Sequence, residues 1–250
     1  MLESRKVFID TQYFVKAGLH FDSPALKSFR KYCESGGLLH ITTTVVEREV
    51  KSKIANSVNE AISAIKTFRR KAKILSSLDD GKIQGLFFEV PEDDIHEMSK
   101  GVFEDYLLGC STTVVDASCV NPENVLALYF GTEAPFGEGK KKSEFPDAFS
   151  LLSLKSHLSE NEKLYVVSDD SDLKAYCESD EQLISIESLD KFLDIYTQHI
   201  NDINEQIKQY FVDNEESIKE RIKSYLEGCE VYNSSGWEDA EVDDGLSVTY

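Results

Sequence analysis

Carboxylates placed beside apolar segments are the residues of this chain whose chemistry is easiest to name. Asp10 directly follows the apolar run VFI, Asp170 follows LYVVS, and Asp147 opens an apolar run behind KKKSEFP. Glu47 lies about one helical turn after the run HIT. A buried cluster of like charges is costly unless cations compensate it, and Mg²⁺ and Mn²⁺ prefer such oxygen ligands. The sequence therefore predicts a carboxylate site for one or two ions, an arrangement that suits in-line phosphoryl displacement.

Each of these carboxylates also has an ordinary structural explanation. Asp10 is placed to end a strand or to cap a helix, and Glu47 is flanked by Arg48 and Lys51 on what reads as a solvated helix face. Asp147 follows a proline in a first helical turn, where the helix dipole favours negative charge. The functional interpretation rests on their joint placement, because chance would scatter acids over both edges of a sheet.

Segments that alternate between strand and helix patterns are needed to bring these acids together. Short apolar runs typical of strands occupy residues 6–9, 38–42, 163–168 and 182–186. A turn is predicted at residues 79–82, and helical patterns occupy residues 23–35, 43–78 with breaks, 91–109, 121–131, 145–158, 171–179 and 187–228. This alternation predicts an α/β fold with a central parallel sheet flanked by helices. In such sheets ligands bind outside the carboxyl ends of the strands.

The bulk composition restricts the classes of protein to consider. The five cysteines are scattered and form no CxxC pair, which favours reduced thiols in a cytoplasm over disulfides or a zinc site. No apolar run approaches the length of a membrane span. The net charge of −19 argues against simple nucleic-acid binding, yet residues 1–80 carry 14 Lys and Arg against 9 Asp and Glu. We therefore expect a cytoplasmic protein with no membrane segment, whose mean charge does not exclude a local basic groove.

The segments that carry the acids resemble, in order and spacing, the four acidic motifs of the PIN-domain nucleases. These segments are VFIDTQYFV, TTTVVEREVK, KSEFPDAFSLLSL and LYVVSDDSDL. The phrases EFPDA and VSDDSDL resemble a bacterial PIN-like branch whose function is poorly described. The resemblance covers about residues 5–190 and implies a Rossmann-like PIN fold. It implies a nuclease domain at residues 1–190, and we expect residues 191–250 to form a helical extension with an acidic tail.

Carried onto this chain, the resemblance implies catalytic and metal-binding roles for four acids, namely Asp10, Glu47, Asp147 and Asp170. Glu144 and Asp172 are implied as further ligands of Mg²⁺ or Mn²⁺. Residues 60–140 are longer than the compact toxin members of the family need, so no substrate preference is carried over from them.

Basic residues near the expected site are candidates to contact the substrate phosphates. These are Lys51, Lys140, Lys141 and Lys142, the last three in a Gly- and Lys-rich loop. Their contacts would be independent of base sequence and sensitive to salt. The alternative is that the lysine loop only aids solubility, and that the basic stretch KTFRRKAK at residues 66–73 is a solvated helix face.

The expected activity is that of a metal-dependent endoribonuclease acting on single-stranded RNA. A structure-specific or single-strand DNA nuclease and a catalytically silent PIN-like binding module are the alternatives. A haloacid-dehalogenase-type phosphatase is disfavoured, because it needs an aspartate where Gln12 stands, two residues after Asp10. The apolar stripe in residues 187–228 suits packing on the domain or a homodimer surface, and the acidic C-terminal region suits a basic protein partner.

Overall fold

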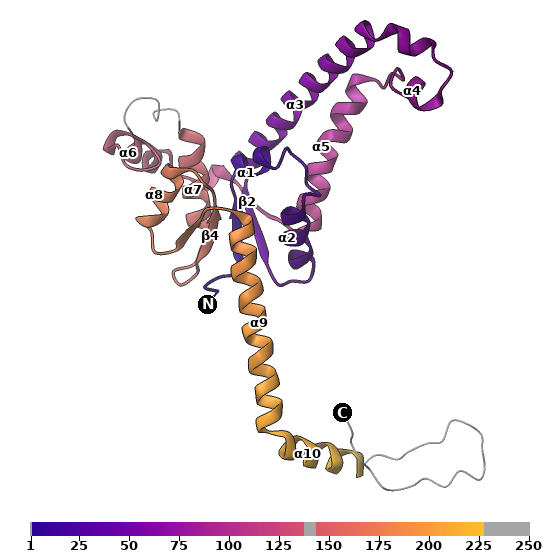
Figure 1. The fold of residues 1–250 in the computed structure, drawn as a ribbon. Coiled ribbons are helices and arrows are strands. Elements are labelled where there is room, and N and C mark those ends of the chain that lie inside the picture. The colour runs from indigo at the N-terminus through magenta and orange to yellow at the C-terminus, as the bar shows by residue number, and fades with distance from the viewer. Residues whose placement is uncertain (1, 138–143, 228–250) are drawn as a thin grey trace, which may run out of the picture. The chain divides into compact units, whose positions relative to one another are not determined.

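The computed structural model describes residues 2–137 and 144–227, which contain a five-stranded parallel sheet (Figure 1). The strands are hydrogen-bonded in the order β3-β2-β1-β4-β5, with β1 in the centre. Val7 of β1 is in register with His40 of β2 and with Tyr165 of β4. The strands are β1 (Lys6–Ile9), β2 (Leu39–Thr43), β3 (Thr113–Val115), β4 (Leu164–Val167) and β5 (Leu183–Ile186). The predicted α/β fold with a central parallel sheet is confirmed.

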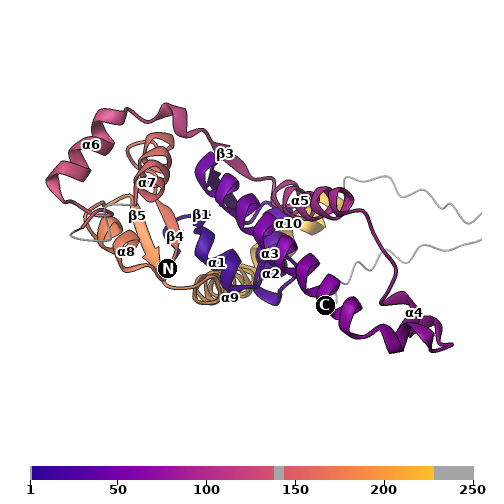
Figure 2. The same cartoon turned by 90° about the horizontal axis from the view of Figure 1, so that it is seen from above.

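Helices lie on both faces of this sheet. The two views place α2 and α5 on one side of the strands and α7 and α8 on the other (Figures 1 and 2). The α-helices are α1 (Thr11–Lys16), α2 (Pro24–Glu34), α3 (Thr44–Lys71), α4 (Gly81–Gly85), α5 (Glu92–Gly109), α6 (Pro122–Gly131), α7 (Phe145–His157), α8 (Ser171–Glu178), α9 (Leu189–Asp213) and α10 (Glu215–Glu227). Two short 3₁₀ turns are η1 (Lys73–Ser77) and η2 (Ala117–Cys119).

Three local elements differ from the sequence expectation. Helix α1 starts directly after Asp10, and β3 adds an edge strand in a segment with no predicted structure. The predicted turn at residues 79–82 contains the start of α4, where the Asp80 side chain accepts hydrogen bonds from the N–H groups of Lys82 and Ile83. An aspartate in that position satisfies free N–H groups at a helix start, so a turn signal and a short helix share the same residues.

The core is built around the central strands, which are apolar on both faces. Val7 and Ile9 of β1 have no exposed surface, and Phe8 has 1 %. Such continuous burial is typical of a parallel strand covered by helices on both sides. On one face an aromatic cluster joins α1, the α1–α2 connection and α5, and its rings lie 5.2–6.1 Å apart; they belong to Phe14, Phe21, Phe103 and Tyr106.

Helices α3 and α5 run past the sheet and project from the domain as a helical arm (residues 60–100), with η1 and α4 at its far end (Figure 1). Near the sheet, α3 buries Val50 and Ile54. Towards the far end its apolar side chains are partly exposed. There Arg69 fixes the connection by donating hydrogen bonds to the carbonyl oxygens of Leu86, at 3.0 Å, and Phe88.

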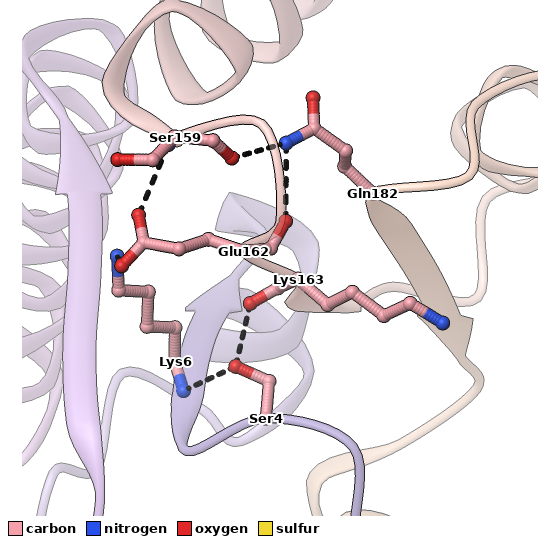
Figure 3. A network of polar contacts seen from close by, with 6 residues as sticks. All are labelled: Ser4, Lys6, Ser159, Glu162, Lys163 and Gln182. Carbon is pink, nitrogen blue, oxygen red and sulfur yellow. Dashed lines mark hydrogen bonds and ion pairs between the residues drawn. The ribbon is translucent and has the colours of Figure 1, made fainter.

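At the amino-terminal ends of the strands, polar side chains form what we call the amino-edge network (Figure 3). The Nζ of Lys6 lies 2.6 Å from Oε1 of Glu162, whose other oxygen accepts the Ser159 N–H at 3.0 Å. Gln182 donates to the carbonyl oxygens of Ser159 and Glu162 at 2.7 and 3.1 Å. Ser4 donates to the carbonyl oxygen of Lys163 at 2.5 Å. Charges and hydrogen-bonding groups at this edge are therefore mutually satisfied.

The chain divides into two compact units, residues 1–195 and residues 196–250. The first unit holds the whole sheet and helices α1 to α8. The described part of the second unit consists of α9 from residue 196 onwards and of the whole of α10. Helix α9 runs through residue 190, and the domain boundary expected there stays a prediction. Within residues 2–137 and 144–227, no helix is both long and apolar enough to cross a membrane.

Candidate functional site

Asp10 ends the central strand and begins α1, and only 5 % of the residue is exposed. One oxygen of its carboxylate accepts a hydrogen bond from Ser168 Oγ at 3.0 Å. Ser168 follows the neighbouring strand β4, and its Oγ also accepts the backbone N–H of Asp170 at 3.1 Å. The Ser168 hydroxyl thus joins the carboxyl ends of β1 and β4 and fixes the orientation of Asp10.

The acid that α3 contributes is Glu49. Thr11 Oγ1 donates a hydrogen bond to Glu49 Oε2 at 2.7 Å, and the negative charge of Glu49 acts on both Asp10 and Asp147. The sequence signal did not separate Glu49 from Glu47, because both lie in the first turns of the same helix. Only their rotation about the helix axis distinguishes them.

Glu47, which the sequence placed in the site, does not join these acids. Its Oε1 lies 2.7 Å from Lys51 Nζ, which also lies 2.9 Å from Glu104 Oε1 of α5. Through Lys51, Glu47 is therefore part of the interface between α3 and α5. The structure thus places Glu49, rather than Glu47, beside Asp10 and Asp147, and the catalytic role expected of Glu47 stays a prediction.

Asp147 lies in the first turn of α7, one turn after Glu144, which is the N-cap position of that helix. The two carboxyl groups share a hydrogen bond. Burial, this hydrogen bond and the charge of Asp10, in that order, raise the pKa of Asp147 to about 8. Burial is likewise the largest cause that raises the pKa of Asp10 to about 6, and the charges of Glu49 and Asp170 add to it.

A buried hydrogen bond sets the position of α7 relative to α3. Thr43, at the end of β2, caps α3 by accepting the Val46 N–H at 3.2 Å. Its hydroxyl also lies 3.1 Å from the hydroxyl of Ser150 in α7. The start of the helix that carries Glu49 is therefore fixed against the helix that carries Asp147.

Asp170 and Asp172 follow β4, as expected from the sequence. Asp170 caps α8, because its Oδ1 accepts the Asp172 N–H at 2.6 Å, and its charge acts on Asp10. Asp172 is half-buried in the first turn of α8 and belongs to the helix start. Asp169 is exposed and forms an ion pair with Lys16.

The basic residues expected to contact the substrate are only partly described. Lys51 is held by the carboxylates of Glu47 and Glu104, which its own raised pKa reflects. Lys140, Lys141 and Lys142 lie outside the described residues.

The donor set of the site consists of carboxylate oxygens, which are the ligands that Mg²⁺ and Mn²⁺ prefer. We call Asp10, Glu49, Glu144, Asp147 and Asp170 the acidic group. Across residues 2–137 and 144–227, no Lys or Arg forms an ion pair with any of its members. The same part of the chain contains no set of three His, Cys, Asp or Glu side chains already arranged to hold a metal ion. Excess negative charge thus fits a cation, and the carboxylates would have to approach one another to bind it.

The fold and the acidic group together define an α/β protein with carboxylates gathered at the carboxyl edge of a parallel sheet. A family model described as "PIN domain" matches residues 7–173, well over half of the chain. The chain therefore belongs to the PIN domain family, whose members are generally nucleases. No significant match was found among curated proteins or among solved structures.

Proposed function

We propose that the protein is a divalent-metal-dependent nuclease that hydrolyses phosphodiester bonds, with single-stranded RNA as the expected substrate. The observation that carries the proposal is the convergence of Asp10, Glu49 and Asp147 from three distant segments. The carboxyl group of Asp10 is buried and those of Glu49 and Asp147 are half-buried, and within the described residues these like charges act on one another with no cation paired to them. Such an arrangement lowers stability unless positive charge is supplied, so it is better explained by a bound ion than by folding.

In this proposal Asp10, Glu49 and Asp147 hold Mg²⁺ or Mn²⁺, with Glu144 and Asp170 completing the negative field. A bound ion would supply Lewis acidity to the phosphate and to a nearby water, the chemistry needed for hydrolysis at phosphorus with departure of the 3′ oxygen. The residues of the chain provide position rather than a nucleophile. Ser168 orients Asp10, and Thr11 orients Glu49.

A cavity beside Ser168 is the place where we propose that part of the substrate binds. It has a volume of about 310 Å³ and includes Ser168 in its wall together with Tyr13 and Lys16. Lys16 is exposed and suits contact with a phosphate next to the one that reacts. Tyr13, which donates to Asp190 at 3.3 Å, offers a ring on which a base can stack.

The test is a cleavage assay on end-labelled single-stranded RNA, single-stranded DNA and flap DNA, each with Mg²⁺, Mn²⁺ or EDTA. We expect cleavage of RNA with either ion, products with 5′-phosphate and 3′-hydroxyl ends, and no cleavage in EDTA. Asp147→Asn should remove the activity, whereas Asp22→Asn, at an exposed acid outside the acidic group, should retain it. Cleavage that persists in EDTA or in Asp147→Asn would contradict the proposal. Cleavage of DNA alone would keep the nuclease and change its substrate.

A further inference from the structure

A second group of reactive side chains is buried behind β2 and shares no residue with the acidic group. Cys33 lies in the last turn of α2, His40 on β2, Tyr106 in the last turn of α5, and Cys110 directly after α5. Their exposed fractions are 5 %, 1 %, 1 % and 2 %. The proposed nuclease reaction uses none of them.

Two polar atoms in this cluster lack a hydrogen-bond partner. Within the described residues, the only such buried side-chain nitrogen or oxygen atoms are His40 Nε2 and Tyr106 Oη. The other ring nitrogen of His40 lies 2.8 Å from Thr112 Oγ1, which fixes the ring. Both side chains interact with the thiol of Cys110. Buried polar groups without partners are rare, and two of them beside one sulfur indicate a role for that sulfur.

The two cysteines are in contact and have opposite acid strengths. A hydrogen bond from Cys33 is the largest cause that lowers the pKa of Cys110 to about 5, and His40 and Tyr106 add to this effect. The same hydrogen bond raises the pKa of Cys33. The lowered pKa of Cys110 favours its thiolate, the nucleophilic form, beside a protonated partner thiol.

A surface side chain, that of Arg30, lies next to the residue that precedes Cys110. Arg30 packs across Gly109, where a Cβ atom would collide with the guanidinium group. The charge of Cys110 acts on Arg30, which also bonds Glu34 at 2.9 Å. Arg30 and Glu34 line a cavity of about 460 Å³ that opens on the surface of α2. We therefore expect a small oxidant to approach Cys110 from the side of this cavity, where Arg30 lies.

We propose that Cys33 and Cys110 are a peroxide-oxidisable pair that forms an intramolecular disulfide between the end of α2 and the end of α5. The Cys110 thiolate attacks one oxygen of hydrogen peroxide, so that an S–O bond forms and the O–O bond breaks. Hydroxide leaves and takes up the proton that Cys110 lost on ionisation. The Cys33 sulfur then attacks the sulfenic acid at Cys110, the S–O bond breaks, and the Cys33 proton leaves with hydroxide as water. Two thiols lose two electrons, and one peroxide becomes two waters.

The test is oxidation of the full-length protein by hydrogen peroxide, followed by peptide mass mapping without reductant. We expect a Cys33–Cys110 cross-linked peptide that is lighter than the two free peptides by two hydrogen atoms and is released by dithiothreitol. A melting temperature higher by about 5–15 °C should accompany it, because the bond closes a long loop in the unfolded chain.

Two variants separate the steps. Cys33→Ser should stop the reaction at the sulfenic acid on Cys110, which dimedone traps, and Cys119→Ala, at an exposed cysteine outside the cluster, should leave the cross-link unchanged. Recovery of Cys33 and Cys110 as free thiols while Cys119 is oxidised would overturn the proposal. So would stoichiometric zinc that is lost in Cys110→Ser, because the thiols would then be metal ligands. The mapping of the wild-type protein does not depend on the folding of any variant or on nuclease activity.

Discussion

The carboxylates at the two edges of the sheet differ in how their negative charge is neutralised. At the amino edge, Glu162 is paired with Lys6 at 2.6 Å, and its pKa is lowered by that contact. At the carboxyl edge, Asp10 and Asp147 face other carboxylates, and burial with like charge raises their pKa values. One edge is arranged to stabilise the fold by itself, whereas the other is left with negative charge that an external cation can neutralise.

The difference teaches how to tell structural charge from functional charge in one molecule. Both edges contain acids, serine hydroxyls and helix ends, so residue types do not separate them. The direction of the pKa shift separates the two edges, because a carboxyl group that the fold stabilises as an anion has its pKa shifted towards the charged form. Asp10 and Asp147 are shifted towards the neutral form, which marks them as groups that the fold alone does not accommodate as anions.

The sharpest way to test this contrast is Asp10→Asn. We expect cleavage to fall by about 10³-fold, because a metal ligand worth several kcal/mol in the transition state is removed. The same variant should be more stable in EDTA by about 1–3 kcal/mol, because a buried carboxylate with raised pKa becomes a neutral amide. Cleavage rates and urea unfolding measure the two effects. Unchanged activity or a loss of stability in EDTA would break the comparison.

The assignment of the α3 acid is tested by a matched pair of substitutions. Glu49→Gln should lower cleavage by about 10²-fold, because it removes a charge that acts on both Asp10 and Asp147. Glu47→Gln should stay within about threefold of wild type, because Glu47 forms a partly exposed ion pair with Lys51. Single-turnover cleavage rates of the two variants measure this difference. A larger loss in Glu47→Gln than in Glu49→Gln would assign the α3 acid of the site to Glu47.

The pH dependence of stability should report the unpaired acids. The pKa values of Asp10 and Asp147 in the folded protein, about 6 and about 8, lie above the ordinary value of 3.8. Protons therefore bind the folded state more tightly, and the stability from these groups is complete below pH ~4 and is lost as the pH rises through 6 and 8. In EDTA we expect a loss on the order of 3–5 kcal/mol by urea unfolding between pH 4.5 and 8.5.

Two comparisons control that measurement. Adding Mn²⁺ at pH 8 should restore stability, because a cation replaces the lost protons as the neutralising charge. The double variant Asp10→Asn with Asp147→Asn should give a flatter profile in EDTA. A wild-type profile that is flat or rises with pH would show that the acids are not unpaired in solution.

A smaller effect is expected at the hydroxyl that joins β1 to β4. Ser168→Ala removes the hydrogen bond to Asp10 and the acceptor for the Asp170 N–H, so we expect a rate about tenfold lower and a higher Mn²⁺ concentration for half-maximal activity. Ser168→Thr keeps the hydroxyl and should recover most of the rate. Equal loss in both variants would assign the effect to packing rather than to the hydrogen bonds.

The smallest effect belongs to the amino edge. Glu162→Gln removes the ion pair with Lys6, and we expect a melting temperature lower by about 1–3 °C with unchanged cleavage. The deficit should shrink as the pH falls through the lowered pKa of Glu162, because protonation then removes the same charge from the wild type. Thermal unfolding at several pH values measures it. A loss of cleavage comparable to that of Asp10→Asn would erase the distinction between the two edges.

Chain order and strand ends were sufficient to predict much of the fold and part of the site. Asp10 directly follows β1, Asp170 comes three residues after the end of β4, and Asp147 opens a helix behind a proline. Each is therefore fixed by one local signal. The edge strand β3 was missed because it has three residues and its β-branched run TTVV borders a helix end, where strand and loop patterns overlap.

The spacing of residues in the sequence does not predict which of Glu47 and Glu49 lies beside Asp10. Each has a lysine four residues later, Lys51 and Lys53, so the helical ion-pair rule treats them alike. The rotation of α3 decides between them, and that rotation depends on contacts with α5 and α7 that are distant in sequence. The Cys33–Cys110 contact was missed for the same reason, because 76 residues separate the two thiols and no local motif pairs them.

Helix α3 joins two parts of the molecule that are otherwise far apart. Its second turn carries Glu49, and the whole helix runs without a break for 28 residues, from the sheet into the helical arm. At 1.5 Å per residue that is a rod of about 42 Å. A partner that binds the far end of the helical arm could therefore tilt α3 and so change the distance between Glu49 and the other acids on which the proposed hydrolysis depends.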